Sequence, residues 1–200
     1  MRVKSHWFKS DQPKPPGQVA SAAAFIVWRV AQNVLKRMRA ARFDIDPGPQ
    51  YFAFLREFLI FLVAIADRIA YARQDQGFRV EFTTALANRV GEILEDNEND
   101  LLGVEASSGS KRRFIALLNE RSADYAAFGY GSDGPDFGFL RYLGNRVTEV
   151  MPEKDQAWTV SQVMEIGAPD AVATVQNAMR DLFAVGPRPD SARRAGMRGD

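Results

Sequence analysis

The sequence predicts an all-α fold, an antiparallel helical bundle of about six to seven helices with a hydrophobic second helix at its centre. Apolar residues recur at the spacing of one helix face along most of the 200-residue chain. The alternation with period two that marks half-buried strands is not sustained anywhere in the sequence. The first three predicted helices also have nearly equal lengths and short connections, as an up-down-up arrangement requires.

The first predicted helix covers residues 18–42 and has one apolar face. With about 100° of rotation per residue, six apolar side chains fall on that face: Ala20, Val27, Val30, Ala31, Val34 and Met38. The sequence Pro47-Gly48-Pro49 separates this helix from the second, which extends to about Arg73. The second helix is therefore predicted to run back along the first.

The second helix is apolar nearly all round between residues 51 and 69, and such a helix is normally the buried centre of a fold. A tight turn at residues 75–77 precedes the third helix, which covers residues 78–102 and ends at Gly103. Its apolar face consists of five residues: Leu86, Val90, Ile93, Leu94 and Leu101. We expect the first and third helices to flank the second, each with its own apolar face.

Shorter helices follow a polar break at residues 105–110. Apolar residues at helical spacing mark a fourth helix over residues 114–128 and a fifth over residues 137–151. A short sixth helix is expected around Trp158. The last covers residues 169–183 and begins with proline, which is favoured at the first helical position.

The length and the end segments predict one domain with two tails. A chain of 200 residues fits a single domain, which we place at residues 18–185. Residues 1–17 are basic and rich in proline, and residues 186–200 combine Gly, Pro and Arg without apolar periodicity. Both are predicted to be flexible, because neither buries enough apolar surface to offset the entropy lost on ordering.

The composition excludes several classes of site. The chain contains no Cys and a single His, His6, which excludes disulfide scaffolds, zinc ribbons, iron–sulfur clusters and thiol nucleophiles. His-rich metal sites and the Glu-x-x-His motif of di-iron bundles are excluded as well. We therefore expect no cofactor, no metal site and no catalytic residue.

The apolar segments predict a protein outside the bilayer. The longest uncharged apolar run covers residues 58–66, whereas a membrane-spanning helix needs about 20 apolar residues. A secretory signal fits poorly, because the apolar stretch from Val19 follows a proline-rich spacer and contains Arg29. We expect a cytoplasmic protein, with peripheral attachment to a membrane as the alternative.

The net charge of +1 conceals two opposed blocks. Residues 1–42 hold nine Lys and Arg residues against one Asp, and residues 43–110 hold five Arg against twelve acidic residues. The basic block ends in a cluster: Lys36, Arg37, Arg39 and Arg42. The acidic block has its densest cluster in the third helix: Glu92, Glu95, Asp96, Glu98 and Asp100. Since the first and third helices would run parallel, we favour mutual neutralisation of the two clusters over an external anionic partner.

The first helix nevertheless carries the candidate partner-binding face. Cationic side chains lie opposite its apolar face, and two aromatic residues are expected on the same side. Exposed aromatics beside cations are typical of surfaces that bind a protein partner or an anionic membrane. The candidate residues are Phe25, Trp28, Arg29, Lys36, Arg37 and Arg39.

Charged residues interrupt the apolar second helix at two places, Arg56-Glu57 and Asp67-Arg68. Buried ion pairs that fix the register of packed helices are the favoured interpretation. With three acids of the third helix, the predicted structural ion-pair residues are Arg56, Glu57, Asp67, Arg68, Glu92, Asp96 and Asp100. An acid–base role for Asp67 or Glu57 is the alternative, and it would need a deep cavity beside one of them.

Two motif-like segments are interpreted as ordinary structure. The acidic string at residues 96–100 resembles the start of an EF-hand loop, but Leu101 and Ser107 stand where that loop needs Gly and Glu. Residues 129–134 have the glycine spacing of a dinucleotide-binding loop without its βαβ context. We expect a flexible interhelical loop there, with Asp133 or Asp136 capping the next helix. Its aromatic neighbours are candidates for a ligand-contacting rim: Phe128, Tyr130 and Phe137.

These observations favour a non-catalytic interaction protein of the adaptor or assembly-factor type, which uses its basic amphipathic first helix to bind a protein partner. A peripheral protein that binds anionic lipid through residues 1–42 is the second hypothesis. An enzyme with a pocket lined by carboxylates and Arg is the third. Nucleic acid ranks last, because the acidic block would repel phosphate. Association with a second copy of the chain stays open.

Overall fold

The computed structural model describes residues 14–103, 105 and 108–184, and it confirms the all-α fold. The helices of this part are α1 (Pro16–Ala40), α2 (Pro49–Arg73), α3 (Gln76–Leu102), α5 (Ser110–Ala126), α6 (Phe137–Val150), α7 (Glu153–Gln162) and α8 (Ala168–Phe183). A π-helical turn, η2 (Val163–Gly167), joins α7 to α8. Most residues of the two predicted tails, including His6, lie outside the described residues.

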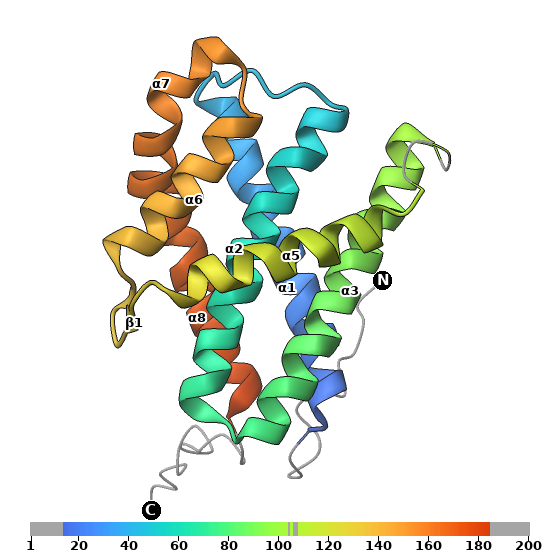
Figure 1. Cartoon of the computed structure of the whole chain (residues 1–200), viewed down its shortest axis with the longest axis vertical. Coiled ribbons are helices and arrows are strands. Elements are labelled where there is room, and N and C mark those ends of the chain that lie inside the picture. The colour runs from blue at the N-terminus through green and yellow to red at the C-terminus, as the bar shows by residue number, and fades with distance from the viewer. Residues whose placement is uncertain (1–13, 104, 106–107, 185–200) are drawn as a thin grey trace, which may run out of the picture.

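Helix α2 is the centre of the bundle, as its sequence predicts. It packs against α1, α3, α5, α6 and α8 (Figure 1). Every side chain from Phe58 to Val63 is at most 1% exposed, so this helix is buried on all sides. Phe61 makes edge-on contacts with Phe58 and with Phe139 of α6, which joins α2 to α6 in the core. Aromatic pairs in this geometry add to the stability gained from burial.

Helix α1 is buried on more than the one face that its sequence predicts. It packs most extensively against α3, and it also contacts α8 and α2. The residues facing these neighbours include small ones, such as Ala20, Ala23 and Ala31, which are fully buried. Small side chains let helix axes approach closely. Helices α1 and α3 therefore pack directly on each other as well as on α2.

The α7–η2–α8 segment runs on as one helical stretch instead of the two separate helices expected around Pro169. Pro169 has no N–H and its ring would clash with a carbonyl one turn earlier in a regular α-helix. The wider π-helical turn lies in the residues just before it, Val163–Gly167. A Cβ on Gly167 would lie 3.2 Å from Val34 of α1, so glycine allows this turn to pack against α1.

The glycine-rich segment is a structured hairpin, which corrects the expected flexible loop. Strands β1 (Tyr130–Gly131) and β2 (Gly134–Pro135) pair antiparallel. The Asp136 carboxylate caps α6 by accepting a hydrogen bond from the Phe139 N–H at 2.8 Å, and it accepts another from the Gly129 N–H at 2.8 Å. These two backbone hydrogen bonds lower the pKa of Asp136. One carboxylate thus fixes both the start of α6 and the base of the hairpin.

Candidate functional site

The outward side of α1 carries one exposed stripe, which we call the α1 stripe. It consists of Ser21, Phe25, Arg29, Asn33 and Lys36. Phe25 is 58% exposed, and the guanidinium carbon of Arg29 lies 5.7 Å from the centre of its ring. Within the described residues, neither cation of the stripe makes an ion pair. The stripe therefore combines an exposed aromatic ring with two cations that have no acidic partner among the described residues.

Trp28 does not belong to this surface, although the sequence placed it there. Its side chain is only 6% exposed. Both flanks of α1 are covered because α3 and α8 pack against it, so residues 27, 28, 30 and 31 are all buried. The prediction was wrong because it gave α1 a single buried face, whereas Trp28 lies on a second buried face of this helix.

Two basic residues at the end of α1 make contacts within the fold, but their partners are not the acidic residues of α3. Arg37 makes an ion pair with Asp170 of α8. Arg39 donates hydrogen bonds from Nε at 2.8 Å and from Nη2 at 2.5 Å to the Ile45 carbonyl, and its guanidinium lies over the ring of Tyr51. These contacts attach the loop between α1 and α2 to the end of α1.

The acidic end of α3 pairs with α2 and α5, which corrects the expected contact with the basic end of α1. Buried Glu98 makes an ion pair with Arg56 of α2 and lies 3.9 Å from Arg113 of α5. Glu92 pairs with Lys111 of α5 at 2.9 Å. In Figure 1 the last turn of α3 lies at the right and the end of α1 at the upper left, because the two helices cross and diverge. Helices α1 and α3 run in the same direction, as predicted, but their carboxyl ends lie far apart.

The other predicted acids of α3 lie in solvent. Asp96 and Asp100 are exposed, and within the part of the chain that the structure describes neither makes an ion pair. Glu92 differs from them because it also pairs with Arg89, 3.0 Å away on its own helix. The hydrogen bonds from Lys111 and Arg89 lower the pKa of Glu92.

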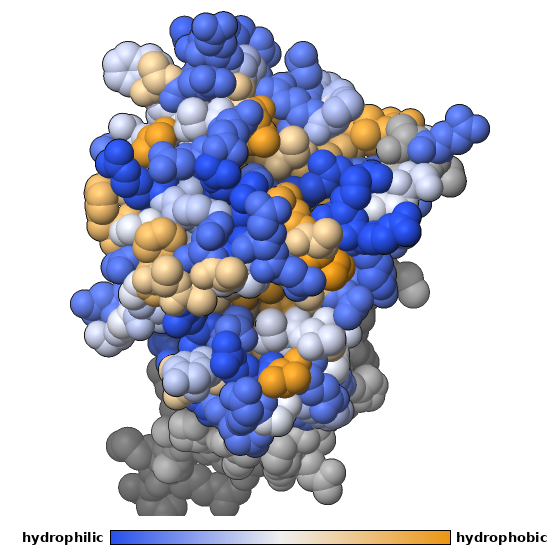
Figure 2. Space-filling model, in the orientation of Figure 1, coloured by the Kyte–Doolittle hydropathy of each residue, from blue (hydrophilic) through white to orange (hydrophobic). Residues whose placement is uncertain are grey.

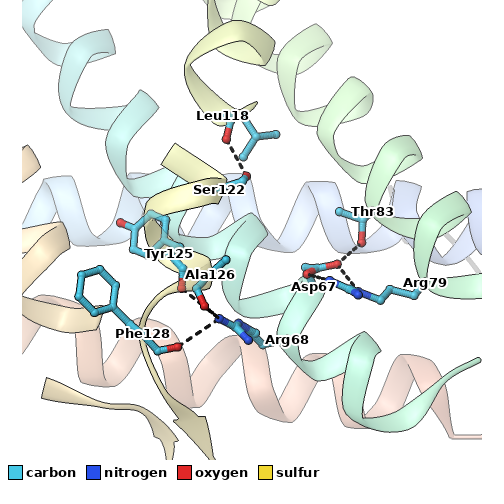
Figure 3. A network of polar contacts seen from close by, with 9 residues as sticks. All are labelled: Asp67, Arg68, Arg79, Thr83, Leu118, Ser122, Tyr125, Ala126 and Phe128. Atoms are coloured by element: carbon cyan, nitrogen blue, oxygen red, sulfur yellow. Dashed lines mark hydrogen bonds and ion pairs between the residues drawn. The ribbon is translucent and has the colours of Figure 1, made fainter. Parts of the chain in front are cut away.

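The charged residues of α2 each find a different neighbour, because adjacent residues on a helix point about 100° apart. Arg56 faces Glu98, whereas Glu57 faces α5, where its Oε2 lies 3.9 Å from the Nε of Arg121. Arg68 donates from Nη2 to the carbonyls of Tyr125, Ala126 and Phe128, at 3.0, 3.1 and 3.1 Å (Figure 3). It therefore caps the carboxyl end of α5.

Asp67 joins α2 to α3 through a three-residue network (Figure 3). Its carboxylate accepts hydrogen bonds from Nε of Arg79 at 2.9 Å, from Nη2 of Arg79 at 2.6 Å and from the Thr83 hydroxyl at 2.8 Å. The hydrogen bonds from Arg79 occupy both carboxylate oxygens, so Asp67 is held in one orientation. Sequence-based reasoning missed Arg79 and Thr83, although the predicted turn at residues 75–77 sets these residues opposite Asp67.

A cleft opens beside this network, between α2, α3 and α5. It has a volume of about 420 Å³. Apolar side chains form its walls: Val63, Ala64, Ala87, Ile115 and Leu118. Polar side chains at its surface come from all three helices: Asp67, Arg68, Arg79, Thr83, Thr84, Asn88, Asn119 and Ser122. The structure thus has a cleft open to the surface beside Asp67, where the third hypothesis required a deep cavity.

A second cluster of polar groups is buried between α2, α5 and α6. Four atoms in it have no hydrogen-bond partner among the described residues: Oε2 of Glu57, Nε of Arg121, the hydroxyl of Tyr125 and Nε of Arg146. Burial raises the pKa of Glu57, and it raises that of Tyr125 well above the ordinary value. Burial and a hydrogen bond to Asp124 raise the pKa of Tyr142 to about 12. The cluster therefore favours the uncharged forms of Glu57 and the tyrosines.

Comparison of the chain with protein-family models, with curated proteins and with solved structures found no match. In the described part of the chain, no group of three or more His, Asp or Glu side chains is placed to hold a metal ion. No helix of this part is long and apolar enough to span a membrane. The α1 stripe and the cleft beside Asp67 are the candidate sites in this part of the chain.

Proposed function

We propose that the protein is a non-catalytic interaction protein that binds an acidic protein partner through the α1 stripe. The observation that carries the proposal is the pair formed by Phe25 and Arg29. The aromatic ring is 58% exposed and the guanidinium carbon lies 5.7 Å from its centre. Aromatic residues and Arg are the types most enriched in the energetically important centres of protein interfaces.

The charge of the stripe supports an acidic partner. Arg29 and Lys36 lie on one side of α1, and no acidic residue occurs between Pro16 and Ala40. A carboxylate brought by a partner would form charge-assisted hydrogen bonds with these cations. Complementary charge of this kind also accelerates the encounter of two proteins at low salt.

The packing of α1 favours a protein partner over the alternative of an anionic membrane. A helix that lies in a membrane interface buries a broad apolar face among the lipids. The apolar face of α1 is already buried against α3, α8 and α2, and Phe25 is the one large apolar side chain of the stripe. Membrane attachment through this helix would require it to leave the bundle.

The experiment compares two matched double variants of the full chain in affinity capture from cells. Phe25→Ser with Arg29→Glu removes the pair on α1. Phe137→Ser with Arg141→Glu changes the same residue types, at the same spacing, on the exposed side of α6. We expect the wild type and the α6 variant to capture the same acidic protein and the α1 variant to lose it.

Binding of the purified partner then gives the quantitative test. We expect the α1 variant to raise the Kd at least about tenfold, which is the scale of one interface hot spot. Higher salt should weaken binding by the wild type, because screening reduces the attraction between exposed charges. Equal capture by the two double variants would overturn the proposal. Flotation of the wild type with anionic vesicles, lost only in the α1 variant, would replace it with the membrane hypothesis.

A further inference from the structure

A second feature, the cleft between α2, α3 and α5, has the build of a small-molecule site. Pockets that bind small molecules typically enclose about 300–1,000 Å³ and combine apolar walls with a few polar groups. The volume of about 420 Å³ lies within this range. Val63 and Leu118 are 1% and 6% exposed, so the wall they form is part of the protein core. A ligand bound there would remove its apolar surface from water against a rigid wall.

The charges in the cleft do not balance. Two guanidinium groups, those of Arg68 and Arg79, face a single carboxylate, that of Asp67. Asp67 is bound by Arg79, whereas the hydrogen bonds of Arg68 go to three neutral carbonyls at the end of α5. Arg68 therefore carries a positive charge for which the cleft provides no counter-charge.

Hydrogen-bond donors also remain for a ligand. Arg79 uses Nε and Nη2 for Asp67, and Arg68 uses Nη2 for the carbonyls. Within the described residues, Nη1 of Arg79 and both Nη1 and Nε of Arg68 donate no hydrogen bond. Figure 3 shows the two guanidinium groups on either side of Asp67. A small anion that reaches Arg68 would gain a charge-assisted hydrogen bond.

The cleft is reached from the surface of the molecule. Thr84, Asn88 and Asn119 are exposed residues of its lining, and they come from α3 and α5. Hydrophobic side chains are visible at the centre of the face that α5 crosses, with hydrophilic ones around them (Figure 2). The mouth of the cleft therefore lies at the surface between α3 and α5.

We propose that this cleft binds a small amphipathic carboxylate, with its apolar body against Val63 and Leu118 and its carboxylate at Arg68. The apolar wall favours a ligand with an apolar body, and the guanidinium of Arg68 favours a negatively charged head group. Asp67 acts as a positioning residue, because it holds Arg79 to one side of the cleft. No residue of the cleft lining belongs to the α1 stripe.

The test uses octanoate as the probe, with octanol and octylammonium as neutral and cationic controls of the same chain length. Binding to the full chain is measured by calorimetry and by amide chemical shifts. We expect octanoate to bind saturably, with a Kd at least about tenfold lower than that of either control, as expected for a charge-assisted hydrogen bond. Octanol binding as tightly as octanoate would overturn the assigned head group.

Two variants locate the site. Arg68→Gln should raise the Kd for octanoate about tenfold while octanol binding stays unchanged. Because Arg68 also caps α5, a second variant tests the cleft without touching that cap: Asn119→Trp places a large ring at the exposed edge of the cleft and should abolish binding. Asn145→Trp, at an exposed position of α6 outside the cleft, is its control and should bind octanoate like the wild type. Unchanged binding by Asn119→Trp, or no saturable binding by the wild type, would overturn the proposal.

Discussion

Asp67 of α2 holds the guanidinium of Arg79 of α3 through two parallel hydrogen bonds, at 2.9 and 2.6 Å. The two residues lie on either side of the turn that joins these helices. Paired bonds of this kind fix direction as well as distance, because both groups are planar. The pair therefore sets the register of the α2–α3 hairpin and shapes one side of the cleft.

Replacing Asp67 with Asn should lower the free energy of unfolding by about 1–3 kcal/mol. The change leaves Arg79 and Thr83 without the carboxylate to which they donate hydrogen bonds, and this pair is mostly shielded from water. Denaturant unfolding measures the loss. Asp170→Asn is the control, since its ion pair with Arg37 is more than half exposed and should contribute less than about 0.5 kcal/mol. Equal losses in the two variants would contradict the structural role of Asp67.

Replacing Glu57 with Gln should change how stability depends on pH. Burial raises the pKa of Glu57 above the ordinary value of 4.5, despite the nearby Arg121 and Arg146, while Glu120 and Glu149 add to the rise. The folded state then binds the Glu57 proton more tightly than the unfolded state does. The stability that the Glu57 proton contributes is therefore lost as the pH rises above 4.5 through the raised pKa.

Because Gln cannot ionise, the Glu57→Gln variant does not lose stability through this group as the pH rises. Its free energy of unfolding, measured in urea at several pH values, should rise relative to that of the wild type between pH 4.5 and neutrality. Asp96→Asn, at an exposed position of α3 away from Glu57, controls for the removal of one negative charge. If the free energy of unfolding of the wild type rises relative to that of the variant over this range, attraction to Arg121 has a larger effect on the pKa of Glu57 than burial has.

Tyr142 should titrate near pH 12. Burial and the hydrogen bond to Asp124 raise its pKa to about 12, so the folded state holds the phenol proton more tightly than the unfolded state. Stability contributed by this group is complete below pH 10 and is lost as the pH rises through 12. Absorbance of the phenolate reports the titration, and Tyr142→Phe should remove the step near pH 12. If that step stays in the variant, it belongs to another tyrosine.

Replacing Gly129 with Ala should destabilise the hairpin and the start of α6. A Cβ at this position would lie 2.7 Å from Oδ2 of Asp136, which caps the helix. Loss of a helix cap costs about 1 kcal/mol, which thermal unfolding can resolve. Gly131→Ala is the matched control in the same hairpin, because a Cβ there meets no atom within 4 Å. Similar midpoints for the two variants would show that the Asp136 side chain moves aside at no cost.

The bounds of the long helices were predictable because local signals mark them. The observed α2, Pro49–Arg73, ends where the sequence predicts and begins at Pro49, the last residue of the predicted separator. Helices α1 and α3 each begin two residues earlier than predicted. Proline at a first position and glycine after a last one act within a turn or two of the chain. Burial of α2 was also predictable, since a helix that is apolar all round has no polar face to place in water.

The ion-pair partners were not predictable for a physical reason. Charges in a folded chain pair where the backbone brings them within about 4 Å, and screening weakens attraction beyond about 10 Å. Helices α1 and α3 run parallel but cross, so the acidic end of α3 reaches Arg56 and Lys111 instead of Arg37. The apolar periodicity of one helix leaves several crossing angles open, because the angle depends on how the side chains of both helices interdigitate.

The sequence by itself therefore determined the helices, their order and the hydrophobic centre, since these follow from local propensity and from which side chains avoid water. The tertiary structure decided what lies on the surface. Contact of α1 with α3 and α8 buried Trp28 and left Phe25 exposed, and the packing of α2, α3 and α5 left a cleft beside Asp67. Such features depend on how several helices pack at once, which is a property of the whole chain and not of any one segment.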